Sequence, residues 1–465
     1  MIRIFRQYFS ITSFMFVLGE GLLIYWAVFW AAYFIYNMDL ELLSIQPMIW
    51  LKILLITIIT QLSLYFNDLY EKKSIDNYID LFTRLIQSIG ITSIVLAVIY
   101  FLFPSTMIGR WIFFISIIFL LLLLVSWRLL YSFVMRRKLF AEKAIILGFG
   151  ELARDILYEA GSRKDLSYEI DSVIVPEQNH DTRNQFKGIS VHYGFDNICD
   201  FVESKNAKNV IVALDEKRGL LPYDELLKCK VRGLNIIDGE DFYERITGKI
   251  LIEKINPSWL IFSDGFVKSK TVRLVKRVVG FINALFSLII LLPLFALVSL
   301  AIRLESKGPI FFSQERVGEN RKIFNLFKFR SMKADAEESS GPVWATDDDP
   351  RITRVGKIIR KLRIDELPQM WNVLKGEMSF VGPRPEREFF VQELEKKIPY
   401  YRERFTVKPG ITGYAQVLYP YGASEKDALE KLKYDLYYIK NISLILDLMV
   451  IFKTIKIVLL GRGAR

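Results

Sequence analysis

The sequence predicts a membrane protein with three parts: an α-helical transmembrane bundle, an α/β Rossmann-like domain, and a mixed α/β domain that carries a re-entrant membrane helix. Four apolar stretches, each long enough to cross a bilayer, open the chain. Short apolar runs then alternate with helical patterns, which is typical of a parallel sheet. A fifth apolar stretch, broken by a proline, precedes the last part. The expected domain limits are 1–138, 139–265 and 266–465, with the re-entrant helix at 278–302.

The composition limits the class of protein. Hydrophobic residues make up 52% of the 465 residues and charged residues 24%, with a mean hydropathy of +0.26. These values exclude a disordered chain and disfavour a purely soluble one. Lys and Arg number 62 against 51 Asp and Glu, a net charge of +11. Membrane topology or an anionic ligand explains this excess. Because no basic motif for nucleic acid is present, we expect no nucleic-acid partner.

Cysteine and histidine are scarce. The chain contains two cysteines, Cys199 and Cys229, and two histidines, His180 and His192. These numbers exclude a disulfide scaffold and leave too few ligands for a zinc site. We expect both cysteines to be ordinary buried small residues. Because no histidine follows His192, any chemistry in the C-terminal half must work without a Ser-His-Asp triad.

The four N-terminal apolar stretches of about 20 residues each match the thickness of a bilayer core. They are Phe14–Tyr36, Met48–Phe66, Leu85–Phe103 and Trp111–Leu130. The first is too long and too aromatic for a cleaved signal peptide. Basic residues lie before it, after the second stretch and at 136–138, whereas the loop after the first carries only acids. The positive-inside rule therefore places the N-terminus and the segment after Lys138 in the cytoplasm.

The fifth apolar stretch, Val278–Ile302, has basic residues on both sides, within 268–277 and from Arg303 onwards. Both flanks therefore favour the cytoplasm. Pro293, near the middle, kinks or breaks a helix. We expect a hairpin that enters one leaflet and returns, with a kinked true span as the alternative. Backbone groups bared at the bend would need partners such as Ser287.

A glycine-rich turn, Gly148-Phe-Gly150-Glu-Leu-Ala153, follows a predicted strand and precedes a predicted helix. This is a G-x-G-x-x-A form of the dinucleotide fingerprint, whose glycines let a phosphate approach the helix N-terminus. After the second strand, Glu177 is a candidate ribose ligand, although Pro176 makes that ending irregular. None of the 22 tyrosines has a lysine four residues on, which disfavours a reductase or dehydratase. We expect a regulatory or structural domain.

The densest set of candidate catalytic residues lies between positions 303 and 416. Asp365 and Glu366 stand just before Pro368 and a helical run that ends at Gly376. Because proline is tolerated in the first turn of a helix, the two acids lie at or near a helix N-terminus, where the dipole favours ionised carboxylates. An ionised carboxylate can attack phosphorus or bind Mg²⁺. The alternative is a charge cluster that merely caps the helix.

Basic residues in short Pro- and Gly-marked segments accompany these acids as candidate phosphate ligands. They are Arg316, Lys328, Arg330, Arg360 and Arg384. A guanidinium group binds two phosphate oxygens in a bidentate way. Carboxylates, a metal ion and arginines together therefore suit phosphoryl transfer. Asp347-Asp348-Asp349 is a rival metal site, similar to the acidic motif of nucleotide-sugar glycosyltransferases. With Pro350 beside it, this run also fits a solvated turn.

These motifs resemble the bacterial sugar transferase family, the monotopic polyprenyl-phosphate glycosyl-1-phosphate transferases. The resemblance covers Lys270 to the C-terminus, and the four spans with a Rossmann-like domain resemble the long form of the family. The motifs that carry it are the Pro-broken hairpin, KFRSM from Lys328, DELPQ from Asp365, WNVLKG from Trp371, SFVGPRP from Ser379 and PGITG from Pro409. Residues 242–266, including the run from Pro257, resemble a branch associated with exopolysaccharide and exosortase gene clusters.

The resemblance implies a reaction and a location. A cytoplasmic UDP-sugar would donate sugar-1-phosphate to undecaprenyl phosphate in the bacterial inner membrane and release UMP, initiating exopolysaccharide or other surface glycan synthesis. Asp365 would attack the β-phosphate and carry the phosphosugar, and Glu366 would bind Mg²⁺. Arg360 and Arg384 match family arginines near phosphate, and Lys328 matches a basic active-site position. The catalytic domain would face the cytoplasm, and a homodimer is expected of the long form.

Three other functions remain open at this point. A membrane-bound glycosyltransferase would use the Asp347 region and release UDP. A non-catalytic polysaccharide-assembly scaffold would release nothing, and alanine at Asp365 would leave it functional. A nucleotide-sugar dehydratase is weakened by the missing tyrosine–lysine pair. The transferred sugar is not encoded in any of these motifs, and Ser443–Leu460 fits either the membrane interface or a subunit contact.

Overall fold

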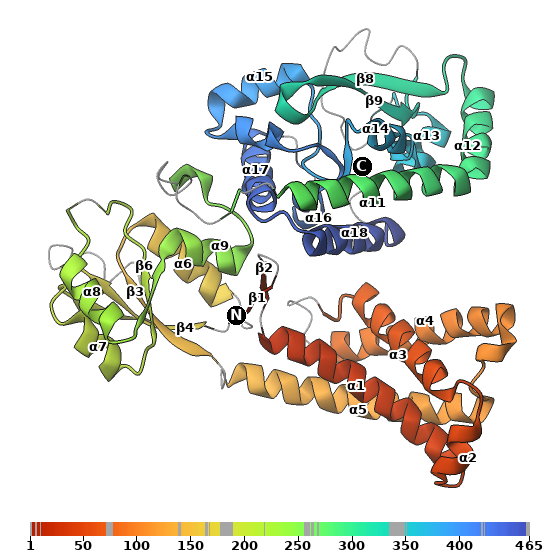
Figure 1. Ribbon diagram of the computed structural model, residues 1–465, viewed down its shortest axis with the longest axis horizontal. Coiled ribbons are helices and arrows are strands. Elements are labelled where there is room, and N and C mark those ends of the chain that lie inside the picture. Colours follow the sequence, from red (N-terminus) through yellow and green to blue (C-terminus); the bar gives the residue numbers. More distant parts are fainter. Residues whose placement is uncertain are drawn as a thin grey trace. The chain divides into compact units, whose positions relative to one another are not determined.

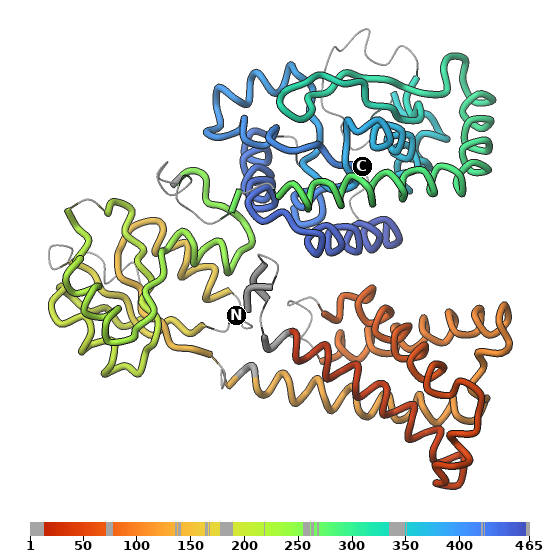
Figure 2. Tube along the Cα trace, in the orientation of Figure 1, coloured from red at the N-terminus to blue at the C-terminus, as the bar shows by residue number. Residues whose placement is uncertain are grey.

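The computed structural model shows helical and α/β parts joined along the chain (Figures 1 and 2). It describes all residues except 1, 5–6, 10, 71–77, 138–140, 163–165, 167, 177–188, 218, 255–260, 262–264, 267–268, 334–348, 350, 420–421, 423 and 462–465. Glu177, His180, Asp347, Asp348 and most of the run from Pro257 therefore lie outside the described residues. Contacts divide the chain into one unit of residues 1–3 and 8–239 and a second of residues 4–7 and 240–465.

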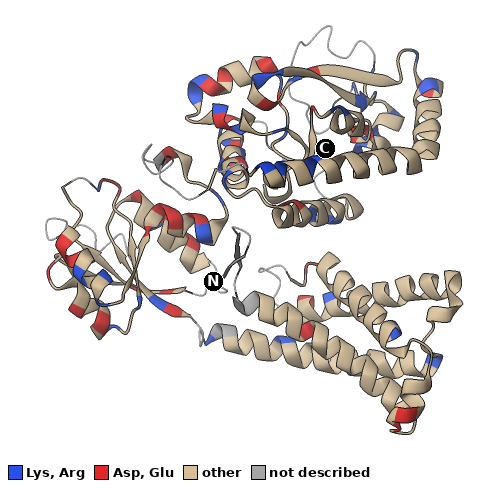
Figure 3. Cartoon of the chain, viewed as in Figure 1, with Lys and Arg blue, Asp and Glu red and all other residues tan. Residues whose placement is uncertain are grey.

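Four long helices confirm the four predicted spans. Each is long and apolar enough to cross a membrane, and Figure 3 shows few charged residues along them. The elements up to this point are β1 (Ile2–Ile4), β2 (Gln7–Phe9), α1 (Ile11–Ile35), α2 (Leu40–Ile45), α3 (Ile49–Phe66), α4 (Tyr78–Leu102), the 3-10 turn η1 (Pro104–Thr106) and α5 (Arg110–Arg136). Helix α1 packs against α3 and α5, and α3 packs against α4.

One ion pair lies inside this bundle. The Arg128 guanidinium on α5 donates from Nε and Nη2 to the two carboxylate oxygens of Glu20 on α1, at 2.9 and 3.0 Å. Its Nη1 donates to the carbonyl of Leu69 at 2.7 Å. Both charged side chains are fully buried. A buried pair of this kind needs both partners, because either charge alone would be stranded in an apolar setting.

The α/β domain has a five-stranded parallel sheet in the order β5-β4-β3-β6-β7. Its first strand lies at the centre and later strands add to either side, which is the Rossmann-like arrangement that the sequence predicts. The strands are β3 (Glu142–Leu147), β4 (Tyr168–Val175), β5 (Ser190–Tyr193), β6 (Asn209–Val212) and β7 (Asn235–Asp238). The helices are α6 (Glu151–Ser162), α7 (Ile198–Ser204) and α8 (Tyr223–Val231). Helix α9 (Gly239–Thr247) follows β7 but belongs, from Glu240 onwards, to the second unit.

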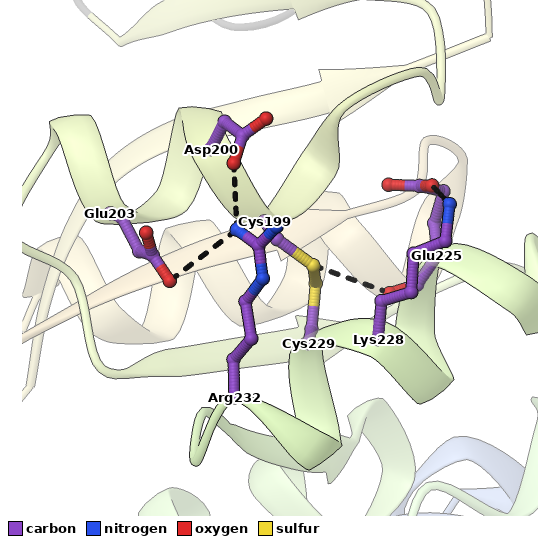
Figure 4. Close-up of a disulfide and its surroundings, with 7 residues drawn as sticks. All are labelled: Cys199, Asp200, Glu203, Glu225, Lys228, Cys229 and Arg232. Atoms are coloured by element: carbon purple, nitrogen blue, oxygen red, sulfur yellow. Dashed lines mark hydrogen bonds and ion pairs between the residues drawn. A yellow bond between two sulfur atoms is a disulfide. The ribbon is translucent and has the colours of Figure 1, made fainter.

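The expectation for the two cysteines was wrong in one respect. Cys199 on α7 and Cys229 on α8 are both buried, as expected, but they form a disulfide (Figure 4). The two helices pack side by side, which brings the Cα atoms to 5.1 Å, inside the range that a disulfide requires. The residues are 30 positions apart in the chain. Spacing alone therefore does not reveal the bond.

The second unit carries the motif-rich segment. Its helices are α11 (Lys270–Ile290), α12 (Leu292–Glu305), α13 (Arg354–Lys361), α14 (Gln369–Lys375), α15 (Glu388–Lys397), α16 (Tyr414–Leu418), α17 (Glu425–Lys440) and α18 (Leu444–Leu459). Strands β8 (Phe311–Val317) and β9 (Ile323–Phe329) pair antiparallel, and β10 (Ser379–Val381) pairs in parallel with β11 (Gly410–Thr412). The 3-10 turns are η3 (Ile252–Lys254), η4 (Glu319–Arg321), η5 (Ile364–Glu366) and η6 (Tyr401–Thr406).

The predicted break in the fifth apolar stretch is present. Helices α11 and α12 meet at Leu291 with a bend of 61°. Pro293 stands in the first turn of α12, where its missing N–H would have no helical partner in any case. Gly280 and Ala284 of α11 are buried, and Ala284 packs in the core of the second unit. The opposite side of the pair exposes large apolar side chains, including Phe286, Leu297 and Leu304. This is the composition of a membrane-embedded surface.

The main core of the second unit gathers around α17 and α18. Leu436, Tyr438 and Val450 are almost fully buried there, together with Val391 of α15. Ile250 and Ile252 join the same core, so residues 240–254 pack with this unit although the sequence grouped them with the α/β domain. The Ser443–Leu460 stretch is thus a helix whose one side is committed to this core.

Candidate active site

The two candidate acids lie on a tight turn between two helices. Helix α13 is tied to α12 by Glu305, whose carboxylate accepts from the N–H groups of Arg354 and Val355 at 2.6 and 3.0 Å. After α13 the chain reverses at Arg363, which has a positive φ of 53°. The short turn η5 then presents Asp365 and Glu366, and α14 follows. The helical run expected after the acids is confirmed.

Glu366 is held by three cations. Arg384 Nη2 donates to Oε1 at 2.8 Å, Lys328 Nζ donates to the same oxygen at 3.3 Å, and Arg363 Nη1 donates to Oε2 at 3.3 Å. The side chain is almost completely buried. Burial alone would raise the pKa of Glu366. The three positive charges, that of Arg384 foremost, instead hold this pKa well below its ordinary value. Glu366 is therefore a fixed, ionised carboxylate.

Asp365 lies in a different environment. It is also buried, but no hydrogen bond or ion pair reaches its carboxylate within the described part of the chain. Burial raises the pKa of Asp365 above its ordinary value, against the opposing charge of Lys328. A carboxylate with a raised pKa is more basic and so more nucleophilic once ionised. The two adjacent acids thus have different chemistry, one anchored and one available.

The partners of the dyad come from separate elements. Lys328 lies near the end of β9, and burial lowers its ammonium pKa. Arg384 follows β10, and its carbonyl accepts from Arg404 Nη2 at 3.1 Å. Arg404 is itself buried and donates to Asp435 on α17 at 3.0 Å. The backbone that carries Arg384 is therefore held without help from the Arg384 side chain.

Two residues of this site were not predicted. Arg363 contacts Glu366 directly, and its spacing of three residues from Glu366 was an available signal. Arg404 had no such signal, because its role depends on the tertiary contact with Arg384. Both are cations, so the site is more basic than the predicted set suggested.

The remaining predicted arginines have different neighbours. Arg360, at the end of α13, lies close enough for its charge to act on Asp365. Arg316 donates to the Pro385 carbonyl at 3.2 Å beside Arg384, and its charge acts on Lys328. Arg330 donates to the Ser306 and Lys307 carbonyls at 2.8 and 2.9 Å. In the structure it therefore fastens the end of α12, and a phosphate-binding role for it stays a prediction.

The donor set suits Mg²⁺ only with help from a ligand. Among the residues that the structure describes, no group of three His, Cys, Asp or Glu side chains could hold a metal ion. The dyad offers two carboxylates. Mg²⁺ is commonly held by one or two carboxylates together with substrate phosphates and water. Glu366 is therefore the candidate ligand for an ion that would arrive with a phosphate-bearing substrate.

The structure describes only part of the acidic run Asp347-Asp348-Asp349. Of its three residues, only Asp349 is among the described ones. Both of its oxygens accept from the guanidinium of Arg351, at 2.8 and 2.5 Å. The side-chain hydrogen bond from Arg351 holds the pKa of Asp349 below its ordinary value. This carboxylate is engaged by its own neighbour in the turn.

The glycine-rich turn is occupied by the protein itself. Gly148 and Gly150 have φ of 136° and 111°, and a Cβ at Gly150 would lie 2.2 Å from the carboxylate of Asp215. That carboxylate accepts from the N–H groups of Glu151 and Leu152 at 2.9 and 3.1 Å. Asp215 follows β6 and so stands where a dinucleotide phosphate would bind in a fingerprint of this type. Ala153 is fully buried.

Two family models match the chain. Residues 271–461 match the bacterial sugar transferase family, and residues 65–219 match a CoA-binding domain. The first match contains α11, α12, the dyad and every cation that contacts Glu366. The second spans the end of the helical bundle and most of the α/β domain. The two matches cover the α/β part and the C-terminal part in the order that the sequence predicts.

Curated relatives share the C-terminal part. The UDP-N-acetylgalactosamine-undecaprenyl-phosphate N-acetylgalactosaminephosphotransferase of Aeromonas hydrophila is 42% identical over 52% of this chain and 56% of its own length. The undecaprenyl-phosphate glucose phosphotransferase of Komagataeibacter xylinus is 41% identical over 46% and 41%. The chain thus spans about half the length of these two relatives. The UDP-galactose-lipid carrier transferase of Erwinia amylovora is 30% identical over 71% of this chain and 70% of its own length. On these matches, this chain belongs to the bacterial sugar transferase family.

Proposed function

We propose that this protein transfers sugar-1-phosphate from a UDP-sugar to undecaprenyl phosphate, forming undecaprenyl-diphosphate sugar and UMP. The observation that carries the proposal is the contrast between the adjacent acids. Glu366 is locked by three cations, whereas Asp365 is buried, unbonded among the described residues and next to the same positive charges. That arrangement suits a nucleophile in a phosphate-binding site.

The reaction proceeds in two displacements at one phosphorus atom. An ionised Asp365 oxygen attacks the β-phosphorus of the UDP-sugar, the bond to the bridging oxygen breaks, and UMP leaves with that oxygen. The phosphosugar is then held as a mixed anhydride on Asp365. A phosphate oxygen of the lipid attacks the same phosphorus, and the carboxylate is released unchanged. Each step keeps the number of bonds to phosphorus constant.

The cations give these steps their electrostatic support. Arg384, Lys328 and Arg360 stand around the acids and would neutralise the diphosphate oxygens as charge moves onto UMP. Glu366 would hold Mg²⁺ bound with the substrate, and the ion would neutralise phosphate charge there. Because Glu366 is ionised and oriented by Arg384, it is suited to that role rather than to attack.

The membrane parts are consistent with a lipid acceptor. The bent pair α11–α12 exposes apolar side chains along its length, so we propose that it enters the inner leaflet from the cytoplasmic side and returns. The basic flanks of α11 and α12 favour that side. The reaction would take place on the inner face of the bacterial cytoplasmic membrane, as the first step of exopolysaccharide or related surface glycan synthesis.

The test is a product assay with purified full-length protein in lipid nanodiscs that contain undecaprenyl phosphate and Mg²⁺. UDP-glucose, UDP-galactose and UDP-N-acetylgalactosamine are supplied separately, and UMP and UDP are measured. We expect UMP with one donor, dependent on the lipid and lost in Asp365→Asn. Asp349→Asn is the matched control, since it removes a neighbouring acid and should retain activity. Release of UDP that survives Asp365→Asn would overturn the proposal.

A labelling experiment tests the covalent step by itself. With a donor that is radiolabelled in the sugar and no acceptor lipid, the wild-type chain should retain label through denaturation. Asp365→Asn should retain none, and addition of undecaprenyl phosphate should discharge the label. If Asp365→Asn is labelled as strongly as wild type, Asp365 is not the nucleophile.

A further inference from the structure

The motif WNVLKG, which begins at Trp371, lies in and just after α14, the helix that follows the acidic dyad. Between the dyad and this helix, Leu367 and Pro368 both have helical dihedral angles, so the chain runs from η5 into α14 without a break. The Trp371 N–H donates to the Pro368 carbonyl at 3.0 Å. The position of α14 therefore sets the position of Asp365 and Glu366.

The side chain of Asn372 fastens α14 to strand β9. It is fully buried. Its amide oxygen accepts from the Phe327 N–H at 3.1 Å, and its amide nitrogen donates to the Asn325 carbonyl at 2.6 Å. The nitrogen also donates to a carboxylate oxygen of Glu377 at 2.7 Å. Aspartate and leucine have a similar shape, but neither can donate the last two bonds.

Strand β9 gains a partner on its second edge in this way. In the described part of the chain it pairs with β8 alone, in a two-stranded sheet. A two-stranded ribbon is only marginally stable by itself. The Asn325 carbonyl and the Phe327 N–H belong to residues two apart, so they point to the same edge of the strand. The Asn372 amide bonds both groups, as a neighbouring strand would.

These bonds fix the register between the strand that carries Lys328 and the helix that follows Glu366. Leu326 of β9 and Val373 of α14 belong to one apolar core, but apolar packing is non-directional and permits sliding. Lys328 Nζ stands 3.3 Å from Glu366 Oε1, slightly farther than in an ordinary N–H···O bond. A small movement of β9 away from α14 would therefore break this contact.

We propose that Asn372 is a positioning residue of the transfer reaction, whose side-chain amide holds Lys328 in place beside the dyad. Its three side-chain bonds reach neither acid, so Asn372 acts through Lys328. Lys328, placed in this way, neutralises phosphate charge during the transfer. The inference rests on the proposed function and adds to it a residue that touches no substrate.

The rate test is a double-mutant cycle with the full-length chain in nanodiscs, measured as UMP release. Asn372→Ala should lower the rate about tenfold, which corresponds to a coupling of the size found between residues of one network. Lys328→Gln leaves Arg384 and Arg363 on Glu366. In that background, Asn372→Ala should change the rate by no more than about twofold. Equal losses in the two backgrounds would overturn the proposal, because a merely structural role is additive.

Matched variants separate positioning from stability. Val450→Ala removes a buried side chain from the core around α17 and α18, whose described residues include none from α14 or β9. It should lower the melting temperature and retain the rate. Glu377→Gln keeps an acceptor oxygen for the Asn372 amide and should retain the rate as well. Glu377→Ala should lower the rate, by less than Asn372→Ala does. Because Glu377→Ala leaves both bonds to β9 in place, it replaces Asn372→Ala in the cycle if that variant does not fold.

Hydrogen exchange tests the same contact without any UDP-sugar. In Asn372→Ala the backbone amides of β9 should exchange faster than in wild type, because the Phe327 N–H loses its acceptor. Val450→Ala should leave β9 protected. If the wild-type chain releases no UMP, the proposed function fails, whereas the exchange data still show whether Asn372 fixes β9. Unchanged exchange of β9 in Asn372→Ala would overturn the positioning role.

Discussion

Arg384→Gln is the substitution that tests the anchoring of Glu366 most directly. Of the three cations on this carboxylate, Arg384 makes the one contact of ideal length, 2.8 Å, whereas Lys328 and Arg363 stand at 3.3 Å. Charge-assisted N–H···O bonds are strongest between 2.7 and 2.9 Å. Glutamine keeps much of the length and polarity of the side chain but removes the charge. The fold should persist, because Arg404 holds the Arg384 carbonyl and not its side chain.

The size of the effect follows from that contact. A hydrogen bond to a charged group contributes about 1.5–3 kcal/mol, and a loss of about 2 kcal/mol corresponds to roughly 30-fold in rate. The two longer contacts to Glu366 remain in the variant. They prevent the complete loss expected for Asp365→Asn. Arg384→Lys should fall between wild type and Arg384→Gln, since it keeps the charge and loses the planar fork.

The assay is the initial rate of UMP release in nanodiscs with saturating undecaprenyl phosphate and Mg²⁺. Lys396→Gln serves as the matched control for loss of one basic residue. Thermal melting of each variant shows whether the fold is intact. A folded Arg384→Gln protein with a rate within threefold of wild type would refute the argument that this contact orients Glu366 for the reaction.

Three further predictions concern stability, each measured by thermal melting in detergent. Asp427→Asn should lower the free energy of unfolding by about 1 kcal/mol at pH 7, because Asp427 and Ser424 form the capping box of α17. The side-chain hydrogen bond from Ser424 lowers the pKa of Asp427, so the difference from wild type should fade as the pH falls through that lowered value. A difference that grows towards acid would contradict this. Asp215→Ala removes the carboxylate that accepts from the first N–H groups of α6, and should lower the free energy of unfolding by about 1 kcal/mol. An unchanged melting midpoint would show that this cap does not stabilise the fold. Arg128→Met should lower the free energy of unfolding by about 3–5 kcal/mol, because it leaves the buried Glu20 carboxylate without its partner. The double variant with Glu20→Leu should recover most of that loss. Additive losses would exclude a coupled pair.

The elements that the sequence predicted best are those with a strong local signal. The four spans are visible as uninterrupted apolar stretches, and the Pro293 break is visible because proline cannot donate within a helix. The parallel sheet follows from alternating strand and helix patterns. Asp365 and Glu366 were recognisable from their spacing before Pro368 and from the motifs around them.

The cations around Glu366 depend on tertiary contacts that local patterns do not reveal. Lys328, Arg363 and Arg384 are separated by up to 56 positions, and their meeting at Glu366 depends on β9, η5 and the segment after β10 packing together. The motif predicted that basic residues matter there but not which one contacts which acid. Arg330 illustrates the limit, since it lies in the same motif as Lys328 yet fastens the end of α12.

By itself, the sequence determined the membrane class and the fold of its parts and singled out Asp365 and Glu366 as candidates, because hydropathy, helix breaking and motif spacing are local properties of the chain. Only the tertiary structure decided that Glu366 is anchored while Asp365 is available, that Asp215 occupies the glycine-rich turn, and that Cys199 is bonded to Cys229. Each of these depends on side chains far apart in the chain meeting in a buried setting. There, the distance between two groups determines whether charges pair, pKa values shift or sulfurs bond.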